Sequence, residues 1–163
     1  MVHYKLTYFN FRGRGEIVRL ILAAANQPFE DDRIEMSNWP ALKSQTPLGQ
    51  LPVLETMSDS GDRIYRVAQS MAIARHLARE LKLAGSNEVE QTIADMYAEH
   101  SQDLFNEYVK IHFEKDEAKK QELREKLQNE TLPNNFAKTE ARLAQNNGHL
   151  AGSGITYADV IYI

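Results

Sequence analysis

The sequence predicts an α/β domain followed by an all-helical domain. In the first half, strand-like runs alternate with amphipathic helical patterns, whereas every pattern in the second half is helical. A short linker ends in Ala84-Gly85-Ser86-Asn87, and Asn87 is a candidate helix N-cap. We therefore expect domains at residues 1–81 and 88–163, joined by a linker at residues 82–87.

The first half is predicted to have the order β-α-β, a connecting segment, then β-β-α. The elements are expected at residues 4–8 (strand), 13–25 (helix), 29–34 (strand), 37–40 (turn or short helix), 53–55 and 64–67 (strands) and 70–81 (helix). Asp59-Ser60-Gly61-Asp62 has hairpin chemistry. The helix at 13–25 should bury one face, made of Ile17, Leu20, Ile21 and Ala24.

The second half should contain two long helices, at residues 88–113 and 116–145. Pro133 is expected to kink or interrupt the second, and Asn146-Asn147-Gly148 should end it. Near the chain end, Thr156 and Asp159 fit a capping box, and Ile155 fits the hydrophobic staple beside it.

Composition excludes several classes of function. The 163 residues include 19 basic and 23 acidic side chains, for a net charge of −4 without a clustered basic face, so we expect no nucleic-acid partner. No apolar run is long enough to span a bilayer, so no membrane partner is expected. Cysteine is absent, which rules out disulfides and thiolate metal sites and fits a cytoplasmic location.

A candidate site for a peptide-like ligand lies in two separated segments. The run Gln50 to Leu54 is a short apolar strand entered through Pro52, and its backbone groups could pair with an extended ligand. Gln69 and Ser70 lie at the start of an amphipathic helix, which suits a carboxylate. With Tyr8 at the end of the first strand, these features make a small peptide thiol the leading candidate ligand.

The chemistry expected of such a site is thiol activation. A free thiol has a pKa near ~8.5, and lowering it by ~2 units requires roughly 2.7 kcal/mol in favour of the thiolate. The Tyr8 phenol can donate a hydrogen bond to a thiolate. A cation such as Arg14 at a helix start is disfavoured by the helix dipole, and a nearby thiolate would stabilise it. The alternatives are a core aromatic residue at Tyr8 and a plain surface residue at Arg14, as we expect for Arg12 and Arg19.

Five motifs together resemble the sigma class of glutathione transferases, in order and over the whole chain. They are Tyr-Phe-Asn-x-Arg-Gly-Arg at 8–14, Trp-Pro-x-x-Lys at 39–43, Pro-x-Gly-Gln-Leu-Pro-Val-Leu-Glu at 47–55, Gln-Ser-x-Ala-Ile-Ala-Arg-x-Leu at 69–77 and Thr-x-Ala-Asp at 156–159. The resemblance implies a thioredoxin-like N-terminal domain, an all-helical C-terminal domain and a homodimer. It also implies glutathione as co-substrate.

The resemblance also implies roles for individual residues. Tyr8 and Arg14 would be catalytic, and the glutathione-binding set would be Tyr8, Arg14, Trp39, Lys43, Gln50, Leu51, Pro52, Gln69, Ser70 and, from the partner subunit, Asp103. Within this set, Trp39 and Lys43 would hold the glycyl carboxylate. A cis bond at Pro52 would leave the Leu51 backbone free to pair with the cysteinyl unit.

The same resemblance bears on a second-substrate pocket and on a metal site. An apolar pocket for the second substrate would be formed by Phe9, Phe11, Gly13 and Phe105. Some relatives bind a divalent cation through aspartates where this chain has Glu99 and Gln102, so no metal is expected here.

Three functions stay open on sequence grounds. The first is conjugation of glutathione to hydrophobic electrophiles, as in detoxification. The second is glutathione-dependent isomerisation of prostaglandin H2 to the D form, weakened because a pocket tryptophan is replaced near Lys110. The third is a non-enzymatic, crystallin-like descendant. The apolar run 160–163 follows a helix too short to be stable alone, so we also expect the chain to be a fragment that lacks further C-terminal helices.

Overall fold

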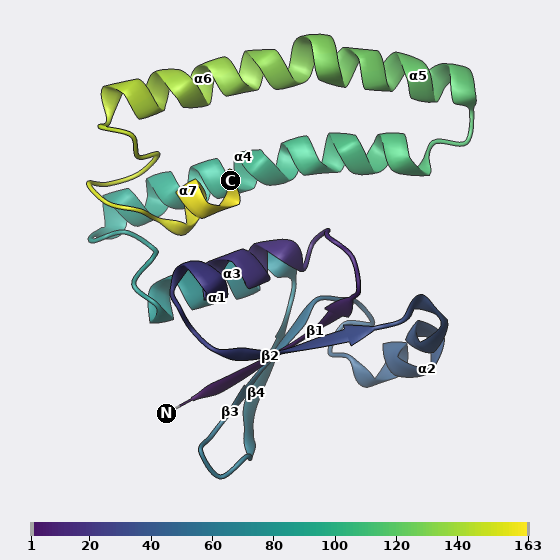
Figure 1. Ribbon diagram of the computed structural model, residues 1–163, viewed down its shortest axis with the longest axis vertical. Helices are drawn as coiled ribbons and strands as arrows, with labels where there is room; N and C mark the ends of the chain where they lie inside the picture. Colours follow the sequence, from purple (N-terminus) through teal and green to yellow (C-terminus); the bar gives the residue numbers. More distant parts are fainter. Residues whose placement is uncertain (1, 163) are drawn as a thin grey trace. The chain divides into compact units, whose positions relative to one another are not determined.

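The computed structural model describes residues 2–162 and forms two compact units, Met1–Ala84 and Gly85–Ile163. Figure 1 shows a small sheet with helices in the first unit and long helices in the second. The first unit contains β1 (His3–Phe9), α1 (Glu16–Ala24), β2 (Phe29–Ile34), β3 (Val53–Met57), β4 (Arg63–Ala68) and α3 (Ser70–Glu80). The predicted thioredoxin-like order β-α-β then β-β-α is confirmed.

The sheet has the strand order β2-β1-β3-β4. β1 and β2 are parallel and joined by α1, as a parallel pair requires, whereas β3 is antiparallel to both β1 and β4. The predicted hairpin joins β3 to β4, with Gly61 at φ +85°. In β1, every second side chain points into the core, so that Tyr4, Leu6 and Tyr8 are all buried.

The helices α1 and α3 contact each other on one face of the sheet (Figure 1). In α3, the predicted inward residues Ile73, Ala74 and Leu77 are fully buried. In α1, the prediction was partly wrong: the helix buries Val18 and Leu22 beside Ile17 and Ile21, whereas Ala24 is exposed. The buried stripe is broader than one row of contacts because α1 packs against both the sheet and α3.

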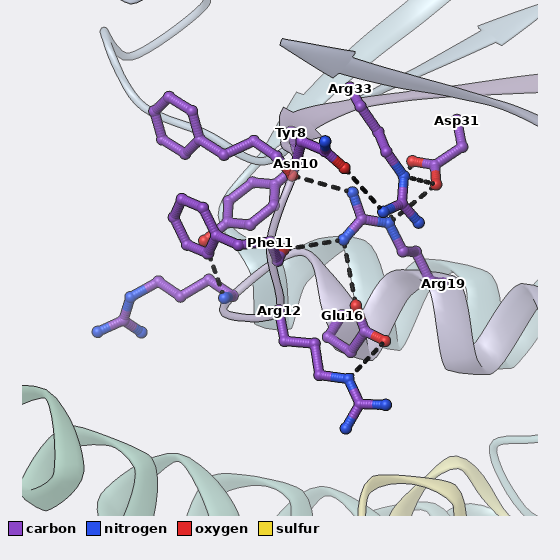
Figure 2. Close-up of polar contacts among 10 residues, drawn as sticks. Tyr8, Asn10, Phe11, Arg12, Glu16, Arg19, Asp31 and Arg33 are labelled. Carbon is purple, nitrogen blue, oxygen red and sulfur yellow. Dashed lines mark hydrogen bonds and ion pairs between the residues drawn. The ribbon is translucent and has the colours of Figure 1, made fainter. Parts of the chain in front are cut away.

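Arg19 was expected to be a surface residue, and this prediction was wrong. Its side chain is only 8% exposed, and its Nε lies 3.1 Å from both carboxylate oxygens of Asp31 in β2. Its Nη1 donates to the Phe11 carbonyl and to the Glu16 carboxylate, and its Nη2 donates to the Phe9 carbonyl (Figure 2). One guanidinium therefore ties together α1, β2 and the segment that follows β1. Sequence spacing cannot reveal this because the three segments meet only in the folded chain.

The second unit contains α4 (Glu88–Phe113), α5 (Glu117–Lys126), a π-helical turn (Leu127–Thr131), α6 (Leu132–Gln145) and α7 (Tyr157–Ile161). Asn87 caps α4 by accepting a hydrogen bond from the Glu90 N–H, as predicted. Among the described residues 2–162, no helix is both long enough and apolar enough to cross a bilayer.

Pro133 interrupts the second long helix as expected. It has no N–H to donate, and its ring would crowd the carbonyl four residues earlier, at Asn129. Asn129 lies within the π-helical turn, where the hydrogen-bond spacing widens before α6 begins. Asn147 and Gly148 then take positive φ values of 53° and 86° and end α6 as predicted.

The capping box at the start of α7 is confirmed. The Asp159 carboxylate accepts hydrogen bonds from the backbone N–H and the hydroxyl of Thr156, and also from the Leu150 N–H. The predicted staple does not form, because Ile155 is 62% exposed while Val160 is buried. The loop is therefore held by polar contacts to Asp159 rather than by an apolar contact of Ile155.

Replacing the buried guanidinium tests its structural role. Arg19→Gln should lower the free energy of unfolding by about 2 to 4 kcal/mol, because Asp31 and two backbone carbonyls lose their charged donor. Arg12→Gln is the matched control, since the Arg12 side chain is 92% exposed. Urea unfolding followed by circular dichroism measures both. Equal midpoints for the two variants would contradict the role given to Arg19.

Candidate functional site

An open cleft of about 530 Å³ lies in the first unit. It gathers residues from the segment after β1, from α2 (Trp39–Leu42), from the loop before β3 and from the start of α3. Its lining residues are Phe9, Arg14, Trp39, Lys43, Gly49, Gln50, Leu51, Gln69 and Ser70. Most residues predicted to bind the peptide ligand are thus brought together, although they are spread over more than fifty positions of the sequence.

The two rims of the cleft are joined by a hydrogen bond. Gln69 Nε2 donates to Gln50 Oε1 at 2.8 Å, linking the start of α3 to the loop before β3. Gln69 has φ 75° and ψ 110°, a backbone conformation that non-glycine residues rarely adopt. The Leu51–Pro52 bond is cis, as expected, and Pro52 is buried.

Ser70 is the first residue of α3, not its N-cap. The capping position belongs to Gln69, whose side chain makes no capping hydrogen bond. Ser70 is only 6% exposed and lines the cleft, so its hydroxyl and the free N–H groups of the first turn of α3 lie at the cleft wall. A helix N-terminus of this kind favours a carboxylate.

Tyr8 is the penultimate residue of β1 and is buried beside the cleft, with 6% of its surface exposed. Its hydroxyl oxygen accepts a hydrogen bond from the Arg14 backbone N–H at 3.0 Å. Burial raises the pKa of the Tyr8 phenol, and the nearby N–H groups and the charges of Arg14 and Arg19 only partly oppose that shift. The phenol therefore stays protonated at neutral pH, and its proton is available for donation.

Two glycines allow the loop after β1 to close over Tyr8. A Cβ atom at Gly15 would lie 2.4 Å from the Tyr8 ring, and one at Gly13 would lie 2.8 Å from the Tyr8 hydroxyl. Any side chain at Gly15 would therefore force the ring or the loop to move. Sequence reasoning missed Gly15, and the only available signal was its place two residues after Gly13.

Aromatic side chains surround the same end of β1. Phe9 and Phe11 are stacked with ring centroids 5.4 Å apart, and each meets the Tyr8 ring edge-on. Phe9 also meets Trp39 edge-on, at 5.8 Å. Together with Gly13, these rings form an apolar patch beside the cleft.

Other predicted residues lie in the second unit. Asp103 is exposed on α4, and Phe105 is half-buried on the same helix next to Tyr108. The second-substrate pocket that would combine Phe105 with the aromatic patch therefore stays a prediction, as does the role of Asp103. Glu99 and Gln102 also lie on α4. Within the described part of the chain, no three His, Asp or Glu side chains are grouped as metal ligands.

Comparison with known proteins places the chain in a family. Residues 4–79 match the glutathione S-transferase N-terminal domain, and residues 102–163 match the glutathione S-transferase C-terminal domain. A glutathione S-transferase of Anopheles gambiae is 36% identical over 99% of this chain and 77% of its own length. The chain belongs to the glutathione S-transferase family and is an enzyme of the transferase class.

Solved structures of related proteins are also similar to this chain. Prostaglandin synthase D of Nilaparvata lugens is 44% identical with a TM-score of 0.85, covering 98% of this chain and 77% of its own. A sigma class glutathione transferase of Fasciola hepatica is 34% identical with the same TM-score, covering 98% and 76%. The predicted resemblance to the sigma class is confirmed.

The close fit of Gly15 against Tyr8 leads to a prediction. Gly15→Ala should lower the free energy of unfolding by about 1 to 3 kcal/mol, because the added methyl overlaps the Tyr8 ring. Its backbone, at φ −81° and ψ −18°, suits alanine, so the loss would come from the overlap. The control is Gly154→Ala, where a Cβ atom meets nothing within 4 Å. Thermal unfolding gives the melting temperature of each variant, and similar values for the two would contradict the prediction.

Proposed function

We propose that the cleft binds glutathione and that Tyr8 and Arg14 activate its thiol for attack on hydrophobic electrophiles. The observation that carries this proposal is the convergence of cationic, amide and helix N-terminal groups around a single cleft, next to a protonated phenol. Glutathione has two carboxylates separated by a thiol-bearing central unit, and the cleft has a polar group for each.

The binding mode follows the order of groups along the cleft. Trp39 and Lys43 hold the glycyl carboxylate through an indole N–H and an ammonium group. Gln50 and the Leu51 backbone pair with the cysteinyl unit. The γ-glutamyl carboxylate meets Ser70 and the N–H groups that begin α3. Gln69, already tied to Gln50, completes that end of the cleft.

The proposed reaction depends on charge stabilisation. Tyr8 donates its phenolic proton as a hydrogen bond to the sulfur, while the Arg14 guanidinium adds positive charge. The backbone N–H at the Tyr8 oxygen polarises the phenol and makes it a stronger donor. The thiol proton passes to solvent water. The thiolate attacks the electrophilic carbon of the second substrate, and the leaving group departs with the electron pair of the bond that breaks.

A prostaglandin H2 D-isomerase is the second candidate. It is favoured by the 44% identity to the structure named as a prostaglandin synthase. Both reactions use the same glutathione thiolate, and they differ in the second substrate. A comparison of glutathione turnover with aryl halides, enals and hydroperoxides against conversion of prostaglandin H2 therefore distinguishes them. A non-enzymatic, crystallin-like role is less well supported, because Tyr8, Arg14, Gln69 and Ser70 are all present around the cleft.

The proposal extends to the assembly and the setting. The active form is a homodimer, in which Asp103 of one subunit pairs with the glutathione amino group bound by the other. The enzyme acts in the cytoplasm and removes reactive electrophiles, without a nucleic-acid or membrane partner. The site uses glutathione as co-substrate and no metal.

Isothermal titration calorimetry with millimolar glutathione tests the binding step directly. The folded chain should release or absorb heat that saturates at one glutathione per subunit. Methionine methyl ester, which lacks both carboxylates and the thiol, is the matched control and should give no saturable heat. No saturable heat with glutathione, on protein shown to be folded by circular dichroism, would overturn the proposed function.

Tyr8→Phe tests the donor. If the hydroxyl supplies about 2 to 3 kcal/mol to the thiolate, kcat/KM for a model aryl halide at neutral pH should fall by roughly 10²-fold. The ultraviolet absorbance of the bound thiolate should also titrate at higher pH. Tyr4→Phe, which removes a hydroxyl from an equally buried residue of the same strand, should leave both unchanged. An unaltered thiol titration in Tyr8→Phe would assign the donor's role to another group.

A further inference from the structure

The part of the cleft proposed to hold the glycyl carboxylate stands on a weak structural element. Three short pieces follow each other at Met36–Asn38, Trp39–Leu42 and Lys43–Gln45, and together we name them the α2 segment. None of its residues is buried. Helical turns this short are not stable by themselves in water. The position of the α2 segment must therefore come from its contacts with the sheet.

Those contacts leave a space. A second pocket of about 180 Å³ lies between the α2 segment and the strands. Trp39, Leu42 and Gln45 line one side of it, and residues of β1, β2, β3 and β4 line the other. Trp39 and Leu51 also line the main cleft, so the pocket and the cleft share a wall. Apart from the ring contact of Trp39 with Phe9, the pocket separates the α2 segment from the strands, so individual polar contacts carry more of the segment's stability.

Arg66 crosses this pocket. It lies on β4, and its Nη1 donates a 2.9 Å hydrogen bond to the carbonyl of Gln45, the last residue of the α2 segment. A carbonyl at the end of a helical turn has no partner within the helix, and a cation is favourable there. The side chain of Arg66 is 27% exposed, so water competes for this bond only in part.

Glu55 fixes the guanidinium from the neighbouring strand. Glu55 on β3 is the register partner of Arg66, and its Oε1 lies 2.8 Å from Arg66 Nε. This contact is an ion pair rather than a directed hydrogen bond, because Nε is buried without a partner of hydrogen-bond geometry. One end of the guanidinium thus lies against the sheet while the other reaches the α2 segment. A lysine at this position has no rigid fork with which to make both contacts.

We propose that Arg66, oriented by Glu55, is a positioning residue for the glutathione cleft. It acts by holding the α2 segment, and with it Trp39 and Lys43, at the distance from Leu51 that the glycyl end of the ligand requires. This inference rests on the proposed function. It adds a residue that touches no substrate and lies in none of the motif positions assigned to ligand binding.

The chain offers a built-in reporter and a matched control. Trp39 is the only tryptophan in the sequence, so tryptophan fluorescence reports on the α2 segment alone. Arg63 lies on the same strand and pairs with the same Glu55 oxygen at 3.1 Å, but its only side-chain bonds within residues 2–162 are to Glu55. Arg66→Met and Arg63→Met therefore both remove one ion pair, and only the first releases the Gln45 carbonyl.

In the ligand-free chain, Arg66→Met should lower the fluorescence anisotropy of Trp39 and increase its quenching by acrylamide, whereas Arg63→Met should match the unaltered protein. The KM for glutathione should rise about tenfold in Arg66→Met, the loss expected for one charge-assisted hydrogen bond, with kcat changed less than about twofold. Arg66→Lys, which keeps the charge, should give intermediate values. It replaces Arg66→Met as the test variant if Arg66→Met does not fold.

Identical Trp39 signals in the Arg66 and Arg63 variants would overturn the proposal. So would a fall in kcat with KM unchanged, because that result would place Arg66 in the chemical step. The fluorescence measurement needs no ligand, so its outcome is independent of the proposed function. If the unaltered chain fails to bind glutathione, the proposed function fails, and the fluorescence alone decides whether Arg66 holds the α2 segment.

Discussion

The guanidinium of Arg19 lies where β1 gives way to α1, and the geometry of the cleft depends on it. It donates to the carbonyls of Phe9 and Phe11, and so fixes the path of the chain immediately after Tyr8. Its charge also lies 5.7 Å from the centre of the Tyr8 ring. With the loop fixed in this way, the Arg14 N–H reaches the Tyr8 hydroxyl. An electrostatic contact below the surface thus determines where the proposed hydrogen-bond donor points.

The two sides of the cleft differ in how firmly they are built. Tyr8 and Ser70 belong to β1 and α3, whose inward faces are buried in the core of the first unit. Trp39 and Lys43 belong to a segment with no buried residue, tied to the sheet by a ring contact and one arginine. Such an arrangement suits an enzyme that must keep the thiol position fixed while a carboxylate end enters and leaves. In the proposed function, the side built from β1 and α3 carries the chemistry, and the α2 segment takes part in the entry and exit of the ligand.

Local chemistry explains which predictions succeeded. The hairpin at 59–62, the cap at Asn87, the interruption before Pro133 and the capping box at Thr156 each depend on groups only a few residues apart. The prediction for Arg19 was wrong because its deciding partner lies on another element of the fold. Arg19 is buried because Asp31 of β2 lies beside it. Ile155 is exposed, and its loop is held by polar contacts of Asp159, Arg142 and Asn146.

The sequence by itself determined the family, the order of helices and strands and most of the residues that line the cleft, because spacing and motif order depend on the chain alone. It could not determine that Gly15 must leave room for the Tyr8 ring, or that Arg66 reaches the α2 segment across a pocket. Such features depend on distances between segments that are far apart in sequence. Only packing sets those distances, since the path of each segment is decided by the surfaces against which the others are buried.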